Sequence, residues 1–453
     1  MHDERQSRPL SATTKSVYAL GDFTVNTVLV SLSMIFATYY LLEVIGMRPA
    51  LAGLVPLIGR TVDAITDPAM GRLSDVTRWR WGRRRPYFLI GAVPFGLTFA
   101  LLWSAPPLAS QWGLFAYYAV LYSLLSIFTT VLSVPYLALL PEMALDYDER
   151  TSLNTYRNAA SVLGIAAAIG MRPLANLFGG GVDGFAAAGA IVGVIMVLPW
   201  LAVHRVSFER PNFQLRSVDL GVVEGLKVVV RHQTFRVLMA LYLCGRIAMD
   251  LMGAMLIIYM TRWIGRSGFF EPMMLLFLAS VVLSLPFWLH LSRNTDKATI
   301  FTVGSLWWMA SLLLLLVAQP GWPTWTMLIF APWAGMGFAV VDLMPWAMIG
   351  DVIDEDDLAT GERREGLYNG VFTFLRKLGG AVAVWLALLA LDVVGLAEPG
   401  HDSQATLWTI RLLASVVPAV FLAAAVWFAR DYRLTRDEHA RILATLRARE
   451  GRG

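Results

Sequence analysis

The sequence predicts an all-α membrane protein whose twelve transmembrane helices form two six-helix bundles. Three observations lead to this fold class. Of the 453 residues, 57% are hydrophobic and 15% are charged, whereas a soluble domain carries about 25% charged residues. Apolar stretches of about 20 residues or more recur along the chain, and each can cross a hydrocarbon core of about 30 Å as a helix. The arginines gather in alternate connections between these stretches, which is the topology signal of membrane proteins.

Hydropathy and charge together predict the order of the elements. The apolar spans fall at residues 16–43, 48–74, 87–107, 111–140, 153–179, 183–203, 233–262, 268–292, 299–318, 324–350, 365–396 and 405–429. The arginine-rich second and sixth connections and both termini are predicted to be cytoplasmic. On the opposite side only Arg262 and Arg266 break this pattern. The predicted division is a tail at 1–15, a bundle at 16–204, a linker at 205–232, a second bundle at 233–430 and a tail at 431–453.

The two predicted bundles share a weak internal similarity. Pro135-Tyr136 and Pro345-Trp346 each precede an acidic stretch that we expect to be a loop. A Glu-Arg pair and a tyrosine follow in both halves. Repeated halves that face one another across a midplane site are the architecture of alternating access, so the pattern favours a transporter.

Composition argues against several other classes of protein. The single cysteine, Cys244, excludes an intrachain disulfide and argues against a thiolate metal centre. Because no nucleophile–base pair, metal-ligand cluster or soluble catalytic domain is evident, we expect neither an enzyme nor a bound cofactor. The net charge of +4 comes from loops and tails, which indicates topology rather than nucleic-acid binding. The polar first 15 residues lack the pattern of a removable signal peptide.

Ionisable residues within a predicted span mark a pathway or a buried pair, because an unpaired charge there costs at least about 2.5–3.5 kcal/mol. The second span holds the densest group, in which Arg60, Asp63 and Asp67 share one helical stripe. Two carboxylates one turn apart repel each other when both are ionised, which favours a captured cation or a retained proton. We therefore interpret Asp63 and Asp67 as a coupling site for H⁺ or Na⁺. The alternative is that Arg60 neutralises one carboxylate in a static packing network.

Other spans supply candidate ligands and counter-ions. Lys377, which is followed by Gly379 and Gly380, is the natural counter-ion for the aspartates of the second span; the alternative is an interfacial lysine that reaches water. Arg246 and Asp250 are spaced i, i+4 and are expected to satisfy each other. Further candidates are the polar residues Asp22, Asn26, Arg157 and Asp342 and the aromatic residues Tyr40, Trp346 and Phe372.

Five motifs extend over nearly the whole predicted membrane domain. They are GDFTVN, RTVDAITDP, WGRRRPYFLIG, VPYLALLPEMALDYDERTSLNTYR and MIGDVIDEDDLATGERREGLYNGVFTFLRKLGG. Together they resemble the glycoside-pentoside-hexuronide:cation symporter family, within the major facilitator superfamily. The resemblance implies the fold of that superfamily and a symporter that couples a solute to a cation.

The resemblance also implies roles for individual residues in the spans. Asp63 and Asp67 fall on the family's paired cation-site aspartates, and Thr130 falls near a cation-site threonine. Lys377 falls on the lysine between the cation and sugar sites. Arg157 falls on a sugar-site arginine.

In the loop GRLSDVTRWRWGRRR the resemblance implies a cytoplasmic gate, which Asp75 would latch together with Arg83 or Arg84. The sugar site of the family is less well matched. The chain departs from it at four positions, where it has Asn26, Ser133, Leu137 and Asp342. Melibiose, the sugar carried by the best-known member of this family, is therefore a poor candidate for the solute.

These features predict cation-coupled symport of a sugar or glycoside by alternating access. A proton or Na⁺ would bind at Asp63 and Asp67 and release Lys377. The solute would then bind in a cavity lined by Asp22, Asn26, Arg157, Asp342, Phe372 and Thr373. An alternative cargo is a lysolipid, with Arg376 at a phosphate and Leu137 and Phe372 at the tail. The solute, the coupling ion and the direction of transport stay open.

We expect an integral protein of the bacterial cytoplasmic (inner) membrane with both termini in the cytoplasm. Its expected partners are a small solute and membrane lipid, with no nucleic acid. We expect the monomer to be functional, and no metal ion other than the Na⁺ considered for Asp63 and Asp67.

Overall fold

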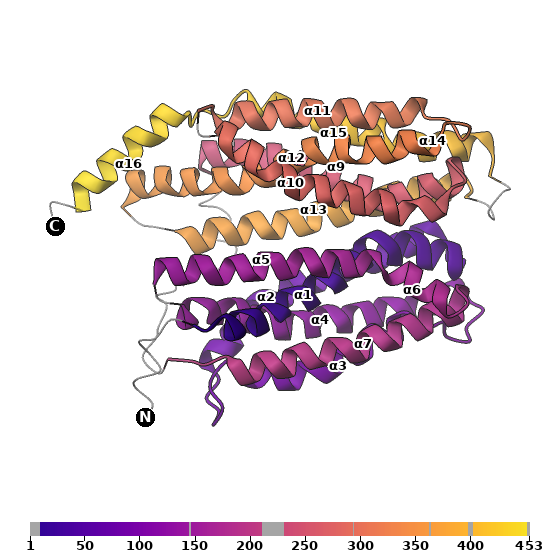
Figure 1. Ribbon diagram of the computed structural model, residues 1–453, viewed down its shortest axis with the longest axis horizontal. Helices are drawn as coiled ribbons and strands as arrows, with labels where there is room; N and C mark the ends of the chain where they lie inside the picture. The colour runs from indigo at the N-terminus through magenta and orange to yellow at the C-terminus, as the bar shows by residue number, and fades with distance from the viewer. Residues whose placement is uncertain are drawn as a thin grey trace. The chain divides into compact units, whose positions relative to one another are not determined.

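The computed structural model is built of long helices (Figure 1) and describes residues 10–144, 146–210, 231–292, 294–361, 364–396 and 402–450. The chain divides into two compact units, Met1–Leu215 and Arg216–Gly453. This division falls within the segment 205–232 that the sequence analysis treats as a linker, and most of that segment lies outside the described residues.

In the first unit, α1 (Ala12–Ser31) continues as the π-helical segment η2 (Leu32–Val44). The helices that follow are α2 (Pro49–Val76), α3 (Pro86–Leu102), α4 (Gln111–Met143), α5 (Tyr147–Ile169), α6 (Met171–Leu177) and α7 (Gly181–Val206). The most extensive helix contacts are those of α1 with α5, α3 with α7 and α2 with α4. Residues from α1, α2, α4 and α5 make up the polar sites of this unit.

In the second unit, α9 (Gln233–Ile258) continues as η3 (Tyr259–Trp263), and the short η4 (Ser267–Phe269) leads into α10 (Phe270–Ser292). The remaining helices are α11 (Lys297–Val317), α12 (Thr324–Thr360), α13 (Glu365–Val393), α14 (Gln404–Ala414), α15 (Val416–Ala429) and α16 (Arg436–Glu450). Here α12 packs on α10 and α11, while α9 packs on α13 and α15.

Nine helices in the described part of the chain are long and apolar enough to cross a membrane, and the bent pair α5–α6 makes a tenth. Two more helices overlap predicted spans without meeting that test. They are α3, which has 17 residues, and α2, which carries Arg60, Asp63 and Asp67. Every predicted span overlaps a helix or a broken helix, and the chain is an integral membrane protein. The count of twelve spans stays a prediction.

The two acidic stretches expected to be loops are largely helical. Only residues 144–146 separate α4 from α5, and α12 continues to Thr360 instead of ending near residue 350. The acidic part of α12 is stabilised by neighbours, since Lys297 Nζ donates to both carboxylate oxygens of Asp351 at 2.7 Å. Gly361 ends the helix with φ +72°, a conformation that glycine adopts without a Cβ clash.

Two spans are interrupted just before a proline, although α2, α4 and α12 continue through prolines of their own. A proline has no N–H to bond to the carbonyl four residues earlier. Pro173 follows Ile169, the last residue of α5, by four residues, and α5 and α6 meet at 43°. Pro418 follows Ala414, the last residue of α14, by the same interval.

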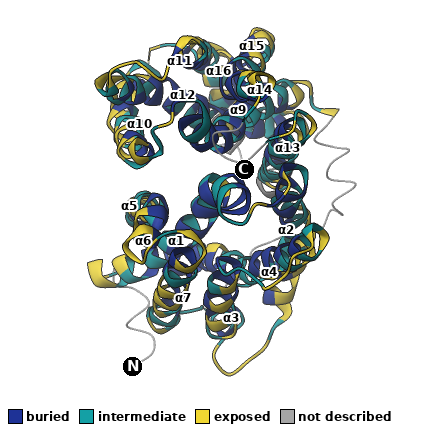
Figure 2. Ribbon diagram, turned by 90° about the vertical axis from the view of Figure 1, so that its right-hand side faces the viewer, coloured by how far each residue is buried: buried dark blue, intermediate teal, exposed yellow. Residues whose placement is uncertain are grey.

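Burial is distributed as in a protein whose solvent is hydrocarbon. Within each unit the buried residues lie where helices face one another, and exposed residues lie on outward faces (Figure 2). Large apolar side chains such as Leu198 on α7 and Leu283 on α10 are exposed on such faces. Soluble monomers rarely expose contiguous apolar surface of this kind, so these faces fit contact with lipid.

Candidate functional site

Arg60, Asp63 and Asp67 follow one another along α2, beside α4. The two helices approach closely at Gly59, where a Cβ atom would lie 2.1 Å from the ring of Tyr122. Asp63 is only 6% exposed, and Arg60 Nη1 lies 3.6 Å from Asp63 Oδ2. The ion pair considered as an alternative to a coupling site is therefore present, and Asp63 has further interactions besides it.

The same helix contact joins Asp67 to Thr130, which is buried on α4. Thr130 Oγ1 donates a hydrogen bond to Asp67 Oδ1 at 2.6 Å, and Thr66 Oγ1 lies 3.4 Å from the Thr130 hydroxyl. Two of the residues predicted for ion coupling are thus brought together from different helices. Hard cations bind carboxylate and hydroxyl oxygens, so Asp67 and Thr130 together offer ligand oxygens of the kind that such an ion needs.

A second polar site joins α1 to α5. Arg157 Nε lies 2.5 Å from Asp22 Oδ2, and Arg157 Nη2 lies 3.0 Å from Asp22 Oδ1. Tyr136 on α4 donates its hydroxyl to Asp22 Oδ2 at 2.6 Å, and its ring lies 5.3 Å from the Arg157 guanidinium. The predicted solute ligands Asp22 and Arg157 therefore form one hydrogen-bonded pair.

Asn26 lies one turn from Asp22 but does not bond to its carboxylate. Its amide nitrogen donates to the backbone oxygen of Asp22 at 2.9 Å and to Ser161 Oγ at 3.1 Å. Close by, a Cβ atom on Gly164 would lie 2.4 Å from the backbone oxygen of Phe23. Asn26 thus contributes to the close packing of α1 on α5.

The second unit has its own group of charges in the membrane helices. Arg246 on α9 donates from Nε to Asp250 Oδ2 at 3.0 Å and from Nη2 to Asp250 Oδ1, which confirms the expected i, i+4 pair. Arg246 Nη1 also lies 3.8 Å from Asp342 Oδ1 on α12. The Asp342 side chain is 48% exposed, so it stays open to a further partner.

An aromatic group lies beside these charges. The rings of Tyr242 on α9 and Phe372 on α13 are stacked, with centroids 4.0 Å apart. Trp346 on α12 meets Phe372 edge-on at 5.0 Å. The Tyr242 hydroxyl is buried and has no hydrogen-bond partner in the described structure. Phe372 is therefore a packing residue between three helices.

Lys377 and Thr373 lie on α13 and are partly buried. The glycines after Lys377 have a packing role within the second unit. A Cβ atom on Gly379 would lie 2.3 Å from Leu243 Cδ1, and one on Gly380 would lie 1.8 Å from Asp250 Oδ2. The Gly-Gly pair thus allows α13 to approach α9 at the Arg246–Asp250 pair. Lys377 belongs to the second unit, whereas Asp63 and Asp67 belong to the first.

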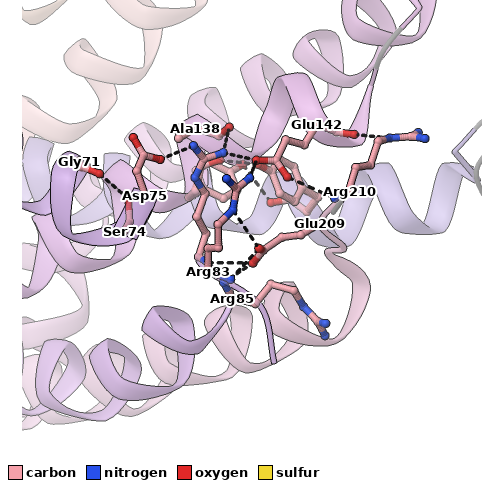
Figure 3. Close-up of polar contacts among 12 residues, drawn as sticks. Gly71, Ser74, Asp75, Arg83, Arg85, Ala138, Glu142, Glu209 and Arg210 are labelled. Atoms are coloured by element: carbon pink, nitrogen blue, oxygen red, sulfur yellow. Dashed lines mark hydrogen bonds and ion pairs between the residues drawn. The ribbon is translucent and has the colours of Figure 1, made fainter. Parts of the chain in front are cut away.

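The predicted gate residues meet in a network between the α2–α3 loop and α4 (Figure 3). Arg84 Nη2 lies 2.7 Å from Asp75 Oδ1, and Arg84 Nη1 donates to the backbone oxygen of Ala138 at 2.7 Å and to Glu142. Arg83 Nη2 lies 2.7 Å from Glu142 Oε1. Of the two arginines considered for Asp75, the salt bridge in the structure is made by Arg84.

Glu209, which follows α7, fixes the backbone of this loop. Its carboxylate accepts hydrogen bonds from the backbone nitrogens of Arg83, Arg84 and Arg85 at 2.7, 2.8 and 3.0 Å (Figure 3). One carboxylate at three successive N–H groups fixes the backbone of the turn from which Arg83 and Arg84 reach Glu142. We call Asp75, Arg83, Arg84, Glu142 and Glu209 the loop network.

Sequence reasoning missed Glu142, Glu209 and Tyr136. Glu142 lies two residues beyond the predicted span 111–140, in a stretch that the sequence predicts to be a loop. In the structure α4 runs to Met143, and Glu142 is completely buried. The only sign of this role in the sequence is that Glu142 is an acidic residue seven positions after Pro135, close to the end of the predicted span. Glu209 has no local signal, because its contacts come from a loop more than a hundred residues earlier.

The chain resembles known proteins over nearly its whole length. The family model described as "MFS/sugar transport protein" matches residues 17–436. An uncharacterized symporter of Synechocystis sp. is 31% identical and covers 99% of both chains. The inner membrane symporter YicJ of Escherichia coli is 29% identical and covers 95% of this chain and 94% of its own.

The chain is also similar to a curated eukaryotic symporter and to a solved bacterial structure. The sodium-dependent lysophosphatidylcholine symporter 1 of Gallus gallus is 27% identical and covers 98% of this chain and 91% of its own. A crystal structure of a bacterial homolog to the human lysosomal transporter Spinster superposes with a TM-score of 0.70 at 11% identity, over 93% of this chain and 97% of that one. The likeness to that structure concerns the fold alone.

Proposed function

The chain belongs to the MFS/sugar transport protein family, and we propose on this premise that it carries a sugar or glycoside together with a proton or Na⁺ by alternating access. Its fold is that of the major facilitator superfamily. Relatives that match it over almost their full length are named symporters. The observation that supports ion coupling best is the contact of Asp67 with Thr130, beside the buried Asp63.

In this proposal the coupling ion binds oxygens of Asp63, Asp67 and Thr130. Two carboxylates one turn apart in a membrane helix are costly to hold ionised, so a proton or cation stabilises the group. Its arrival changes the charge on α2 and so shifts the balance between the two access states, by as much as its affinity for them differs. Lys377 keeps its proposed role of counter-ion, and by resemblance it falls on the family's lysine between the cation and sugar sites.

For the solute we propose polar contacts from both units. Asp342 is half-exposed near the centre of α12, and its ion pair with Arg246 is long at 3.8 Å, so it can accept a hydrogen bond from a hydroxyl group. Asp22 and Arg157 hold each other in place, and a solute hydroxyl would add to this network rather than find a bare carboxylate. Asn26, Phe372 and Thr373 complete the proposed set of solute-site residues.

We assign gating to the loop network. Arg84 joins the exposed Asp75 to the buried Glu142, so it links the end of α2 to α4. A change of access state would be accompanied by the breaking of the outer bond, from Arg84 to Asp75. Glu209 would keep the turn itself intact.

A lysolipid is the second candidate cargo, and two observations favour it. The relative from Gallus gallus is named a sodium-dependent lysophosphatidylcholine symporter and matches 98% of this chain. Leu137, one of the four positions at which the chain departs from the family's sugar site, is 53% exposed on α4. An apolar side chain at that position suits an acyl tail better than a sugar ring.

We further propose that the protein resides in the bacterial inner membrane, as the name of its Escherichia coli relative says of that protein. The arginine distribution supports cytoplasmic termini. We expect one chain to be sufficient for transport.

The cargo is tested with purified protein in proteoliposomes. Proton and Na⁺ entry are recorded on addition of monosaccharides, disaccharides, glycosides and uronides, and uptake of labelled lysophosphatidylcholine is recorded in parallel. Asp63→Asn/Asp67→Asn protein serves as the control. Sugar-induced cation entry that the control lacks supports the proposal; lysolipid uptake without any response to sugars overturns the sugar assignment.

A further inference from the structure

Arg262 and Arg266 are the two basic residues that break the charge pattern on the side opposite the arginine-rich loops. The charge of Arg262 is paired with a carboxylate of the same unit. Arg262 Nη1 lies 3.0 Å from Asp402 Oδ2, and each of the two side chains is 4% exposed. This ion pair ties η3 to the segment that precedes α14.

Arg266 has no such partner. Its Nη1 donates to the backbone oxygen of Trp322 at 2.8 Å and to Thr324 Oγ1 at 3.1 Å, and its backbone nitrogen donates to the oxygen of Met260 at 3.0 Å. In the described part of the chain no carboxylate lies within ion-pair distance of this guanidinium. Neutral oxygens therefore fix this guanidinium, which forms no ion pair with the described residues.

An apolar groove begins beside Arg266. It has a volume of about 290 Å³ and lies between the ends of α9 and α11 and the start of α12. Its floor is buried and its rim is exposed, since Tyr259 and Met273 are almost inaccessible while Ile329 and Trp333 are at least half exposed. The lining residues are Leu256, Tyr259, Met260, Ile264, Met273, Leu314, Leu315, Ala318, Trp322, Thr326, Met327, Ile329, Phe330 and Trp333.

The charge and the groove share residues. Met260 and Trp322 line the groove, and both accept hydrogen bonds from Arg266 through their backbone oxygens. These residues lie at the ends of membrane-spanning helices, where tryptophan is enriched at the level of lipid headgroups. A cation at headgroup level above an apolar groove is complementary to a phosphate attached to a hydrocarbon chain.

We propose that this groove is a binding site for a membrane phospholipid, with an acyl chain between α9, α11 and α12 and the phosphate on Arg266. Arg266 can add charge-assisted hydrogen bonds to phosphate from the donors that Trp322 and Thr324 leave unused. The groove is apolar, so within the membrane it is filled by hydrocarbon rather than by water. The site is independent of the solute and ion sites proposed above and would hold a lipid that is bound but not transported.

The test is native mass spectrometry of the full-length protein after removal of endogenous lipid. The probes are phosphatidylglycerol and a diacylglycerol with the same acyl chains, which lacks the phosphate. The variants are Arg266→Gln and Ala318→Leu, which fills the groove. The control is Arg441→Gln, at an exposed arginine of α16. Thermal unfolding of each variant confirms that the fold is kept.

We expect wild-type and Arg441→Gln protein to retain phosphatidylglycerol and to bind the diacylglycerol about tenfold more weakly. Arg266→Gln should lose about tenfold in affinity for phosphatidylglycerol and little for the diacylglycerol, and Ala318→Leu should lose both. Equal retention of the two lipids by wild type, or unchanged retention by a folded Arg266→Gln variant, would overturn the proposal. So would uptake of lysophosphatidylcholine that Ala318→Leu abolishes, since the groove would then be part of a transport path.

Discussion

Several charges in the described membrane helices are held by partners on the same helix or on a neighbouring one. Asp22 and Arg157 form a two-bond ion pair between α1 and α5, with Tyr136 as a third member. Arg246 and Asp250 form a similar pair within α9. Removing one member of a buried pair leaves an uncompensated charge, which costs more than the pair contributes. Single substitutions at these pairs therefore measure desolvation as well as lost contacts.

The hydrogen bond from Thr130 to Asp67 gives a test of the ion site. Thr130→Val keeps the shape of the side chain but removes the hydroxyl, and Thr130→Ser keeps the hydroxyl. If Na⁺ is the coupling ion, Thr130→Val removes one of its proposed ligand oxygens and should weaken its apparent affinity about tenfold or more, which corresponds to about 1.4 kcal/mol or more. No such loss is expected for a proton, because Thr130 donates its hydrogen bond to the ionised carboxylate of Asp67. The dependence of solute uptake on cation concentration measures this effect. Equal weakening by Thr130→Ser would point to packing instead.

The Asp22–Arg157 pair is tested by a double-mutant cycle. Asp22→Asn or Arg157→Gln alone should lower the free energy of unfolding by about 3–5 kcal/mol, because each leaves a charge without its partner. The double variant should be more stable than the sum of the two single changes allows. Thermal or denaturant unfolding in detergent gives the comparison. Additive losses would contradict the pairing seen in the structure.

At the scale of the helix, hydropathy alone predicts where the membrane helices lie, since every predicted span overlaps a helix or a broken helix. Helix ends were harder to predict, because they depend on contacts between helices. The acidic end of α12 stays helical since Lys297 pairs with Asp351, and sequence patterns gave no sign of that partner. The breaks before Pro173 and Pro418 were in principle visible, since each proline lies within an apolar run.

The approach of α13 to α9 depends on Gly380. A Cβ atom at this position would lie 1.8 Å from Asp250 Oδ2, and Arg246 holds that carboxylate in place. Gly380→Ala should therefore lower the free energy of unfolding by about 1–3 kcal/mol, as overpacking does. Gly370→Ala in the same helix is the matched control, because no atom lies within 4 Å of its Cβ position. A comparable loss in both variants would show that helix packing is not the cause.

The loop network depends more on Glu142 than on Asp75. Glu142 is fully buried and contacts both Arg83 and Arg84, whereas the Asp75 side chain is 57% exposed. Glu142→Gln keeps the shape but removes the charge, and should cost about 3–5 kcal/mol as a broken buried pair. Asp75→Asn should cost about 1 kcal/mol or less. Unfolding midpoints of the two variants in detergent check this order, and the reverse order would contradict it.

For the protein as a whole, the predicted fold class and family are confirmed. The motifs that carry the family resemblance are short, continuous stretches, so the family can be recognised from a single sequence. The arrangement of side chains was predictable where both partners lie on one helix, as for Arg246 and Asp250, or where the resemblance supplied the pairing, as for Asp67 and Thr130. The Asp22–Arg157 pair and the anchoring role of Glu209 depend on packing between distant segments, for which sequence spacing gives no signal. Roles in binding and gating stay proposals.

The central claim is that Asp63 and Asp67 couple the solute to a cation gradient. Its most direct test is uphill accumulation of a transported solute in proteoliposomes under an imposed proton or Na⁺ gradient, with Asp63→Asn compared with wild type. We predict that the variant loses accumulation while it still exchanges solute between the two sides without a gradient. Accumulation by Asp63→Asn at the wild-type level would contradict the claim.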